Sequence, residues 1–232
     1  MQLSFAAMSE TPTTQHPMPF CRIELAVLAP QGGRLALLLS KRDAIPDRGK
    51  WALPGGVVKI EEDADLDDAA ARVAKERLGH LPNGLQPLRA VGGRGRDTRG
   101  AARGWAISLV YRALLGSPPD VTAGKRVQEL RWVDVTEFGS LGFWAFDHKQ
   151  LAQEAVATTR RDIEDFRFPP GYLPSKFTLT ELQRACEAAL GQPLEKSNFR
   201  RKLRDRDVVE AVEGEFQTGA FRPAALYRLK AQ

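Results

Sequence analysis

The 232-residue sequence contains only two cysteines, Cys21 and Cys186, which excludes a disulfide framework as the source of its stability. No Cys and His residues stand at the spacing of a zinc site. No apolar run approaches the roughly 20 residues that a membrane-spanning helix requires. The first 19 residues lack the basic start and apolar stretch of a secretion signal. We therefore expect a disordered tail over residues 1–19, a cytoplasmic location and no membrane contact.

Internal repeats, low-complexity segments and an activated nucleophile are also missing. Residues 92–104 are rich in Gly and Arg but do not match the glycine pattern of dinucleotide-binding folds, so we expect a loop there. What is present is a globular composition, with 43% hydrophobic and 27% charged residues. The net charge of +5 is weak support for a polyanionic partner.

The first part of the chain mixes short strand patterns with one clear helix. The strand patterns cover residues 22–28, 34–39, 105–115 and 129–133, and the helix covers residues 65–78 and stops at Gly79. This alternation predicts layers of helices and a sheet.

The second part is predominantly helical. A helix is predicted over residues 147–165, and the Pro-rich and Gly-containing residues 166–174 end it. Thr178 and Glu181 then form a capping box for an amphipathic helix that stops at Gly191. A basic helix starts at Ser197, a turn is expected at residues 214–219, and a strand covers residues 225–229. Helix, turn, basic helix and hairpin in this order predict a winged helix.

One segment resembles a Nudix box. It begins with Trp51-Ala-Leu-Pro-Gly-Gly and continues through an acidic stretch into the helix that stops at Gly79. In the Nudix pattern, glutamates on one helix face hold the magnesium ions that bridge a diphosphate. Those positions are Val73, Glu76 and Arg77 here, so we expect no metal site and no catalytic residue. A rearranged metal site is the alternative, built from Glu61, Glu62, Asp63, Asp67 and Asp68.

Across both parts, the sequence resembles the Nudix-related transcriptional regulators of NAD metabolism, the NrtR-type repressors. The similarity rests on the degenerate box, on residues 96–100 (Arg-Asp-Thr-Arg-Gly), 144–148 (Trp-Ala-Phe-Asp-His) and 197–203 (Ser-Asn-Phe-Arg-Arg-Lys-Leu), and on residues 222–229. It implies a homodimer whose Nudix-like domains bind ADP-ribose or a related nucleotide. It also implies that the winged helices bind a double-stranded DNA operator and repress genes of NAD biosynthesis or salvage.

The expected fold class is α/β (α+β), a Nudix-like α/β/α sandwich followed by a winged helix-turn-helix domain. We divide the chain into the tail, a ligand-sensing domain at residues 20–148, a connecting helix and linker at 149–170, and a DNA-binding domain at 171–232. No cofactor is required in this interpretation, and the nucleotide is an effector.

Arginines carry most of the predicted sites. Arg96, Asp97 and Arg99 suit the binding of a pyrophosphate without cleavage, because guanidinium groups can replace a metal. Arg42, Trp51 and Glu76 are weaker candidates for the same pocket. We expect Asp147 and His148 to form a structural helix cap. The predicted DNA contacts are Ser197, Asn198, Arg200, Arg201, Lys202, Arg204 and, in the wing, Arg222.

Two other functions stay open at this stage. An active ADP-ribose hydrolase with an accessory DNA- or RNA-binding domain would need three carboxylates around one magnesium ion. An RNA-binding module would need exposed stacking aromatics on the basic helix, whereas Phe199 is expected to point inward.

Overall fold

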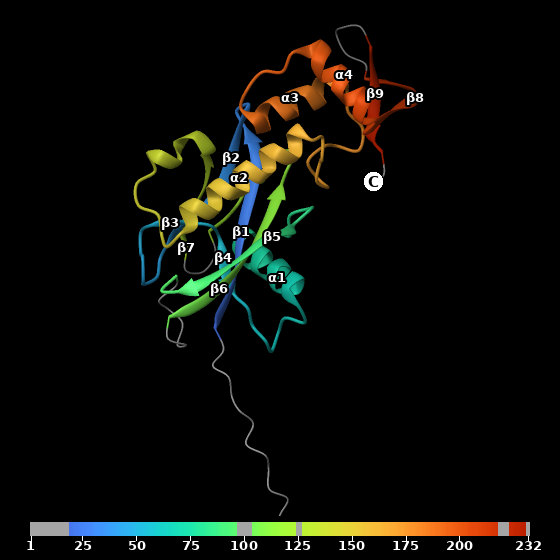
Figure 1. Ribbon diagram of the computed structural model, residues 1–232. Coiled ribbons are helices and arrows are strands. Elements are labelled where there is room, and N and C mark those ends of the chain that lie inside the picture. The colour runs from blue at the N-terminus through green and yellow to red at the C-terminus, as the bar shows by residue number, and fades with distance from the viewer. Residues whose placement is uncertain (1–18, 97–103, 124–126, 218–222, 231–232) are drawn as a thin grey trace, which may run out of the picture.

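The computed structural model describes residues 19–96, 104–123, 127–217 and 223–230 (Figure 1). Residues 1–18 of the expected tail lie outside these ranges, as do the predicted site residues Asp97, Arg99 and Arg222.

A mixed sheet of seven strands lies at the centre of the first part, counted within the described ranges. Its order is β3-β2-β1-β6-β5, with β4 beside β1 and β7 beside β2. β1 and β6 run parallel, and the other neighbours run antiparallel. The strands are β1 (Phe20–Gln31), β2 (Arg34–Arg42), β3 (Trp51–Ala52), β4 (Gly55–Val57), β5 (Gln86–Arg94), β6 (Trp105–Leu114) and β7 (Val127–Asp134). The four predicted strands correspond to β1, β2, β6 and β7.

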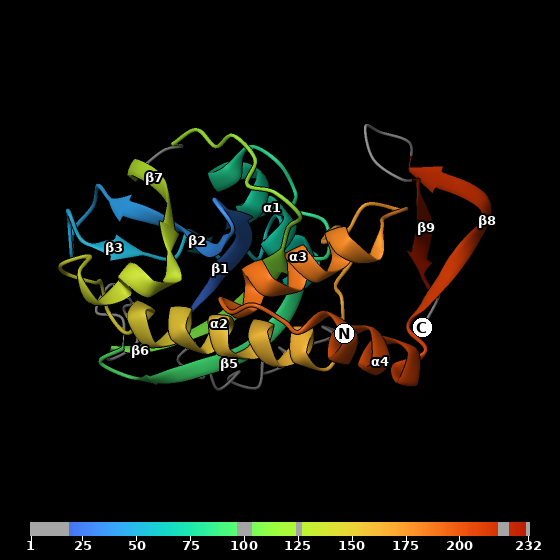
Figure 2. The same cartoon turned by 90° about the horizontal axis from the view of Figure 1, so that it is seen from above.

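Successive side chains of β1 alternate between two apolar cores, as the pleat of a strand requires. Ile23 and Leu25 pack in the core that contains α1 (Leu66–Leu78), and Ala26 and Leu28 pack in the core that contains α2 (His148–Glu164). The two helices lie on opposite faces of the sheet (Figures 1 and 2). The predicted α/β/α sandwich is therefore confirmed.

Local sequence accounts for the bounds of α1. The Asp65 side chain caps the helix by accepting a hydrogen bond from the Asp68 N–H, and Gly79 ends it in the left-handed region at φ 80°. The predicted helix over residues 65–78 agrees with these bounds.

The helix α2 belongs to both parts of the molecule. Near its start, Leu151 and Ala152 face the sheet, and near its end Ile163 joins the core formed with Phe177 and Leu182 of the second part. Residues 166–174 follow α2 without continuing it, as predicted. At 17 residues α2 is the longest described helix, and none of the described helices has the length and apolar character needed to cross a membrane.

The second part contains α3 (Leu179–Leu190), α4 (Lys196–Arg206) and the hairpin of β8 (Val209–Gln217) and β9 (Ala224–Leu229). The capping box of Thr178 and Glu181 is present. Phe177 pairs with Tyr227 and adds a third backbone segment beside the hairpin. α2 packs against α3, α3 packs against α4, and the hairpin follows α4, so the predicted winged-helix arrangement is confirmed.

Three elements differ from the expectation. The expected loop over residues 92–104 begins later, because β5 continues to Arg94 as a largely exposed edge strand without buried alternation. The turn expected at residues 214–219 also begins later, since β8 continues to Gln217 and Gly214 lies at an irregularity of the hairpin with φ 71°. The 3₁₀ helix η1 (Val135–Gly139) was not predicted.

Candidate nucleic-acid interface and ligand site

The helix α4 presents a basic face to solvent. Phe199 and Leu203 are buried one helical turn apart, so residues about half a turn away point outward. Ser197, Arg201 and Arg204 lie on that outward face, and Arg200 lies on its flank; all four are exposed. Within the part of the chain that the structure describes, the side chains of Arg200 and Arg204 form no hydrogen bond or ion pair, so their guanidinium groups are available to phosphate or base edges.

The N-terminus of α4 is capped by a carboxylate. Glu195 accepts hydrogen bonds from the backbone N–H groups of Ser197 at 2.8 Å and Asn198 at 2.6 Å. The Asn198 side chain in turn accepts a bond of 3.0 Å from Arg201. Hydrogen bonds from Ser197 and Asn198 hold the pKa of Glu195 below its ordinary value, so the cap is ionised at neutral pH.

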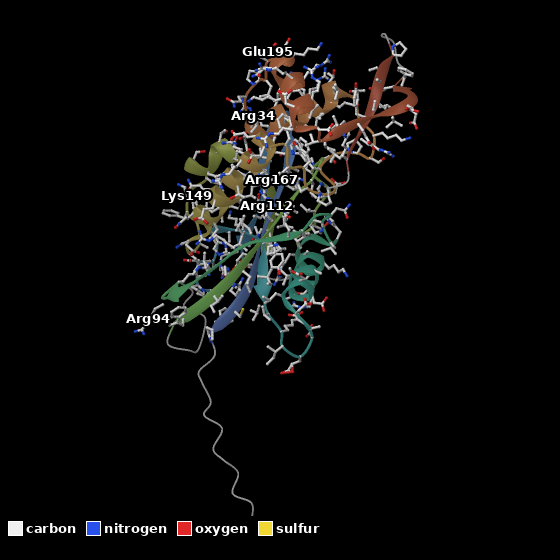
Figure 3. All side chains as sticks on the ribbon, turned by 45° about the vertical axis from the view of Figure 1, so that its right-hand side comes forward. Arg34, Arg94, Arg112, Lys149, Arg167 and Glu195 are labelled. Carbon is white, nitrogen blue, oxygen red and sulfur yellow. The ribbon has the colours of Figure 1, made fainter. Side chains whose placement is uncertain are left out.

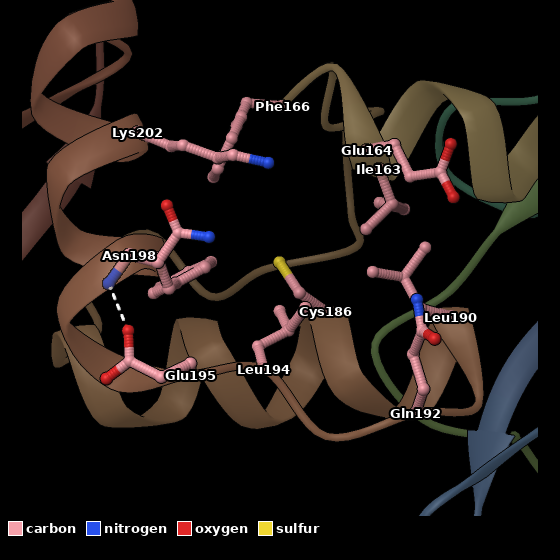
Figure 4. A pocket seen from close by; sticks show the side chains of 11 residues that line it. Ile163, Glu164, Phe166, Cys186, Leu190, Gln192, Leu194, Glu195, Asn198 and Lys202 are labelled. Carbon is pink, nitrogen blue, oxygen red and sulfur yellow. Dashed lines mark hydrogen bonds between the residues drawn. The ribbon is translucent and has the colours of Figure 1, made fainter.

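A cavity of about 300 Å³ separates α4 from the end of α2 (Figure 4). Ile163 and Phe166 line it from the end of α2, and Cys186 lines it from α3. Asn198 and Lys202 line it from α4, so these two predicted DNA contacts lie on the side turned toward α2. Burial raises the pKa of the Cys186 thiol to about 12, which keeps it protonated and unreactive.

A second cavity, of about 130 Å³, lies against the Nudix-like box. Arginines from three elements line it: Arg22 from β1, Arg42 from β2 and Arg77 from the end of α1. No carboxylate occurs among its described lining residues. Because guanidinium groups pair with phosphate through two parallel hydrogen bonds, this cavity suits an anion. We call it the arginine cavity.

Backbone carbonyls and one carboxylate orient these arginines. Arg77 Nε donates to the Gly55 carbonyl at 2.9 Å, and Arg42 donates to the Pro46 carbonyl through Nε at 3.1 Å and Nη2 at 2.9 Å. Arg22 Nε donates to the buried Glu24 carboxylate at 2.8 Å. The charges of the cavity are therefore held in place before any ligand arrives.

Glu24 and His148 form a buried polar cluster behind the arginine cavity. Burial alone would raise the pKa of Glu24, but the guanidinium groups of Arg22 and Arg96 hold it below its ordinary value. Burial lowers the pKa of His148, so its ring is neutral, and its Nδ1 accepts a bond of 3.0 Å from the Leu53 N–H. The second oxygen of Glu24 has no hydrogen-bond partner among the described residues.

Arg96 joins the end of β5 to the start of α2. Its guanidinium makes two bonds to the Asp147 carboxylate, of 2.6 and 2.9 Å, and a third of 2.6 Å to the Ser108 hydroxyl. Only 9% of the Arg96 side chain is exposed. The expected cap by Asp147 is wrong, because that carboxylate makes no capping bond and binds Arg96 instead. His148 has the structural role we expected, but as a buried acceptor.

The carboxylates of the box are engaged by cations. Glu76 is exposed and pairs with Arg72 at 3.1 Å and Lys59 at 3.3 Å, and Arg72 also holds Asp63 at 2.6 Å. Val73 is fully buried and packs directly beneath Gly56. Within the described ranges, no three His, Cys, Asp or Glu residues are grouped so that they could hold a metal ion.

The structure brings together only some of the predicted ligand residues. Arg42 lines the arginine cavity, whereas Trp51 belongs to the buried core beneath Arg131, and Glu76 and Arg96 do not line the cavity. Sequence reasoning missed Arg22 and Arg77. The sequence shows Arg77 as a cation at a glutamate position, but we used it only to exclude a metal site and did not infer that it could attract an anion. Arg22 lies in an apolar strand pattern that gives no sign of a site.

Comparison with known proteins supports a two-part organisation. The family described as NUDIX domain matches residues 23–155, and the NrtR DNA-binding winged helix domain matches residues 171–229. A relative from Acinetobacter baylyi, the "ADPR responsive transcriptional repressor NtrR", is 33% identical over 227 residues, which cover 98% of this chain and 88% of the relative.

Two solved structures of Shewanella oneidensis NrtR are also similar. The structure complexed with a 27mer DNA has a TM-score of 0.68 and 28% identity, and covers 90% of this chain and 93% of its own. The structure of its NUDIX domain complexed with ADP ribose has a TM-score of 0.57 and 26% identity, and covers 65% of this chain and 94% of its own.

Proposed function

Because this chain belongs to the NrtR family of Nudix-related transcriptional repressors, we propose that it binds operator DNA through α4 and is released by ADP-ribose. The observation that carries the proposal is the pairing of an exposed basic helix in a winged helix with an arginine-lined cavity in a Nudix domain. Each half supplies one of the two binding activities that a ligand-responsive repressor needs.

The outward face of α4 is the proposed DNA-reading surface. Ser197, Arg200, Arg201 and Arg204 are exposed on it or on its flank, and Arg222 in the wing stays a predicted contact. We assign Asn198 and Lys202 to the cavity beside α2 rather than to the DNA. A homodimer would place two such helices on two half-sites of an operator.

ADP-ribose is the proposed effector, and its diphosphate is the part that the arginine cavity fits. At about 130 Å³ the cavity is smaller than the roughly 300 to 1,000 Å³ of pockets that enclose whole ligands, so it suits a small anionic group of the nucleotide. The relative named for its response to ADPR and the ADP-ribose complex of a similar Nudix domain support this choice. Genes of NAD biosynthesis or salvage are the proposed targets.

We also infer that the chain does not hydrolyse ADP-ribose. The two glutamate positions occupied by Val73 and Arg77 provide no ligand for magnesium, and Glu76 is neutralised by Arg72 and Lys59. The alternative, an active hydrolase, would need a cluster of carboxylates to hold its metal ion, and the described residues contain no such cluster.

Fluorescence anisotropy with the full-length protein tests the proposal. A labelled duplex from the region upstream of its own gene should bind at least about a thousandfold more tightly than random DNA. ADP-ribose should release it, whereas ribose 5-phosphate, which lacks the diphosphate, should not. Equal affinity for both duplexes would contradict sequence-specific repression, and an undisturbed complex at saturating ADP-ribose would contradict the effector.

A further inference from the structure

Arg77 stands where the Nudix pattern has the last of its metal-binding glutamates. Its guanidinium lines the arginine cavity and donates to the Gly55 carbonyl at 2.9 Å. In place of an acidic side chain that holds a cation, this position therefore carries a cation of its own.

We propose that Arg77 supplies the positive charge that a divalent metal supplies to a Nudix enzyme, and that the cavity takes a diphosphate ligand without its metal ion. The inference rests on the proposed function only in using ADP-ribose as the probe. It specifies the chemical form of the ligand, which is the free diphosphate anion rather than its magnesium complex.

The electrostatics of the cavity favour the metal-free anion. Three guanidinium groups line it, and one of them, that of Arg22, pairs with the buried Glu24 carboxylate at 2.8 Å. A divalent cation placed among them would be repelled, because like charges at a few ångströms interact unfavourably where solvent is partly excluded. An arginine does not lose its proton at physiological pH, so the positive charge is permanent.

The acidic groups nearby do not restore a metal site. Glu76 accepts from Arg72 and Lys59, Glu62 pairs with Lys59 at 2.9 Å, and Arg72 holds the pKa of Asp63 at about 2 through two hydrogen bonds. Releasing any of them to a metal would break at least one ion pair of this network.

This arrangement predicts the sign of the magnesium effect. Magnesium in solution binds the diphosphate and reduces its negative charge, so the complex is a poorer partner for arginines. Magnesium should therefore leave ADP-ribose affinity unchanged or weaken it, whereas a metal-dependent Nudix site shows the opposite response.

Isothermal titration of the full-length wild-type protein with ADP-ribose, in EDTA and in excess magnesium, provides the first test. We expect binding in EDTA that is at least as tight as in magnesium. If ADP-ribose binds only when magnesium is present, this inference is overturned while the proposed effector stands. If it binds under neither condition, the proposed effector fails as well.

The Arg77→Gln variant provides the second test. In EDTA it should bind ADP-ribose about tenfold or more weakly, because a charge-assisted hydrogen bond is lost. Lys75→Gln is the matched control: it removes the same charge from the exposed side of α1 and should bind as the wild type does. Equal losses in the two variants, or wild-type affinity in Arg77→Gln, would overturn the role of Arg77. Thermal unfolding of both variants checks that the loss is not one of folding.

Discussion

At the scale of single residues, Arg201 and Lys202 show how neighbours in the chain have different surroundings. Arg201 lies on the outward face of α4, and Lys202 lines the cavity beside Phe166. Comparing the removal of each side chain therefore distinguishes the effect of a specific contact on DNA affinity from the effect of the net positive charge of the helix.

We expect Arg201→Ala to weaken operator binding by about 1 to 3 kcal/mol if the guanidinium reaches a base edge. If it contacts phosphate instead, affinity should fall on all sequences and the salt dependence should drop by about one unit. Lys202→Ala removes the same charge and should change affinity little. Anisotropy titrations at several salt concentrations measure both, and matching losses in the two variants would show that only net charge matters.

His148 gives the stability of the protein a dependence on pH. Burial lowers its pKa in the folded state, and Glu24, Arg22, Arg96 and Asp147 are the charged groups around it. The unfolded chain takes up the proton first as pH falls below about 6.5. The contribution is therefore fully present above that pH, and it is lost as pH falls toward the folded-state pKa, by up to about 1.4 kcal/mol per pH unit.

Urea unfolding between pH 7.5 and pH 5.5 checks this expectation. His148→Gln should unfold with a flatter pH profile, because it cannot be protonated, and its amide oxygen still offers an acceptor to the Leu53 N–H. A variant as steep as the wild type would assign the pH dependence to another group.

At the scale of elements, α2 packs against both the central sheet and the winged helix. Its start is tied by Asp147 to Arg96, and its 17 residues span about 25 Å. At its other end Phe166 adopts a left-handed backbone with φ 58°, which is unfavourable for a bulky residue, and its ring lies 5.7 Å from that of Phe199 in α4. Figure 3 shows Arg94, at the end of β5, and Glu195, before α4, at opposite ends of the molecule. A rigid helix anchored at both ends can carry a displacement between them.

We therefore expect the Arg96–Asp147 pair to affect the loss of DNA affinity that ADP-ribose induces more than it affects the binding of ADP-ribose itself. In Asp147→Asn the carboxylate that receives two bonds from Arg96 becomes an amide, while the fold around it keeps its shape. We expect DNA affinity without ligand to stay near that of the wild type and the ADP-ribose-induced loss of affinity to shrink several-fold. Coupling energies between sites are typically about 1 to 3 kcal/mol, so the change is measurable by anisotropy.

Arg89→Gln is the matched control for Asp147→Asn. It removes an exposed ion pair of 2.7 Å between β5 and Glu154 of the same helix. If this control reduces the response as much as Asp147→Asn does, contact between β5 and α2 in general is responsible rather than the buried pair.

Elements with strong local signals could be predicted from the sequence. The capping residues Asp65, Thr178 and Gly191 fix helix ends through short-range hydrogen bonds and backbone conformation, and they lie where the sequence indicated. β5 could not be predicted, because an exposed edge strand carries no alternating apolar pattern and is formed by pairing with β6. Local sequence also gives no indication that Asp147 binds a residue 51 positions earlier.

The two candidate sites were predictable to different degrees, because local sequence shows the faces of a helix but not which distant segments of the chain meet. The basic face of α4 follows from a period of 3.6 residues around Phe199 and Leu203. The arginine cavity is assembled from β1, β2 and the end of α1, and it depends on sheet order, which periodicity does not encode. Arg42 was among the weaker candidates for the predicted pocket, whereas Arg22 becomes a cavity residue only through pairing of β1 with β4.

At the scale of the whole molecule, one apolar core runs from the sheet to α4. Leu37 of β2, Ile163 of α2, Leu182 of α3 and Phe199 of α4 all belong to it. The helix α4 is therefore not an independent unit on a flexible linker, and a change of packing at the sheet alters its environment. Such a core gives a physical reason for two distant ligands to influence each other.

Influence of this kind must be mutual. ADP-ribose can shift the protein away from the DNA-binding arrangement only through a difference in its affinity for the two arrangements. Thermodynamic linkage then requires that operator DNA weaken ADP-ribose binding by the factor by which ADP-ribose weakens DNA binding. For a coupling of about 1 to 3 kcal/mol, that factor lies between about 5 and 150.

We expect isothermal titration of ADP-ribose into the protein, alone and with saturating operator duplex, to give the factor obtained by anisotropy. The Arg201→Ala variant controls for effects of the duplex itself. At an operator concentration too low to saturate this variant, the duplex should change its ADP-ribose affinity less than it changes that of the wild type. Two unequal factors would mean that ADP-ribose and DNA do not act on one equilibrium, and an unchanged ADP-ribose affinity would mean that the continuous core does not couple them.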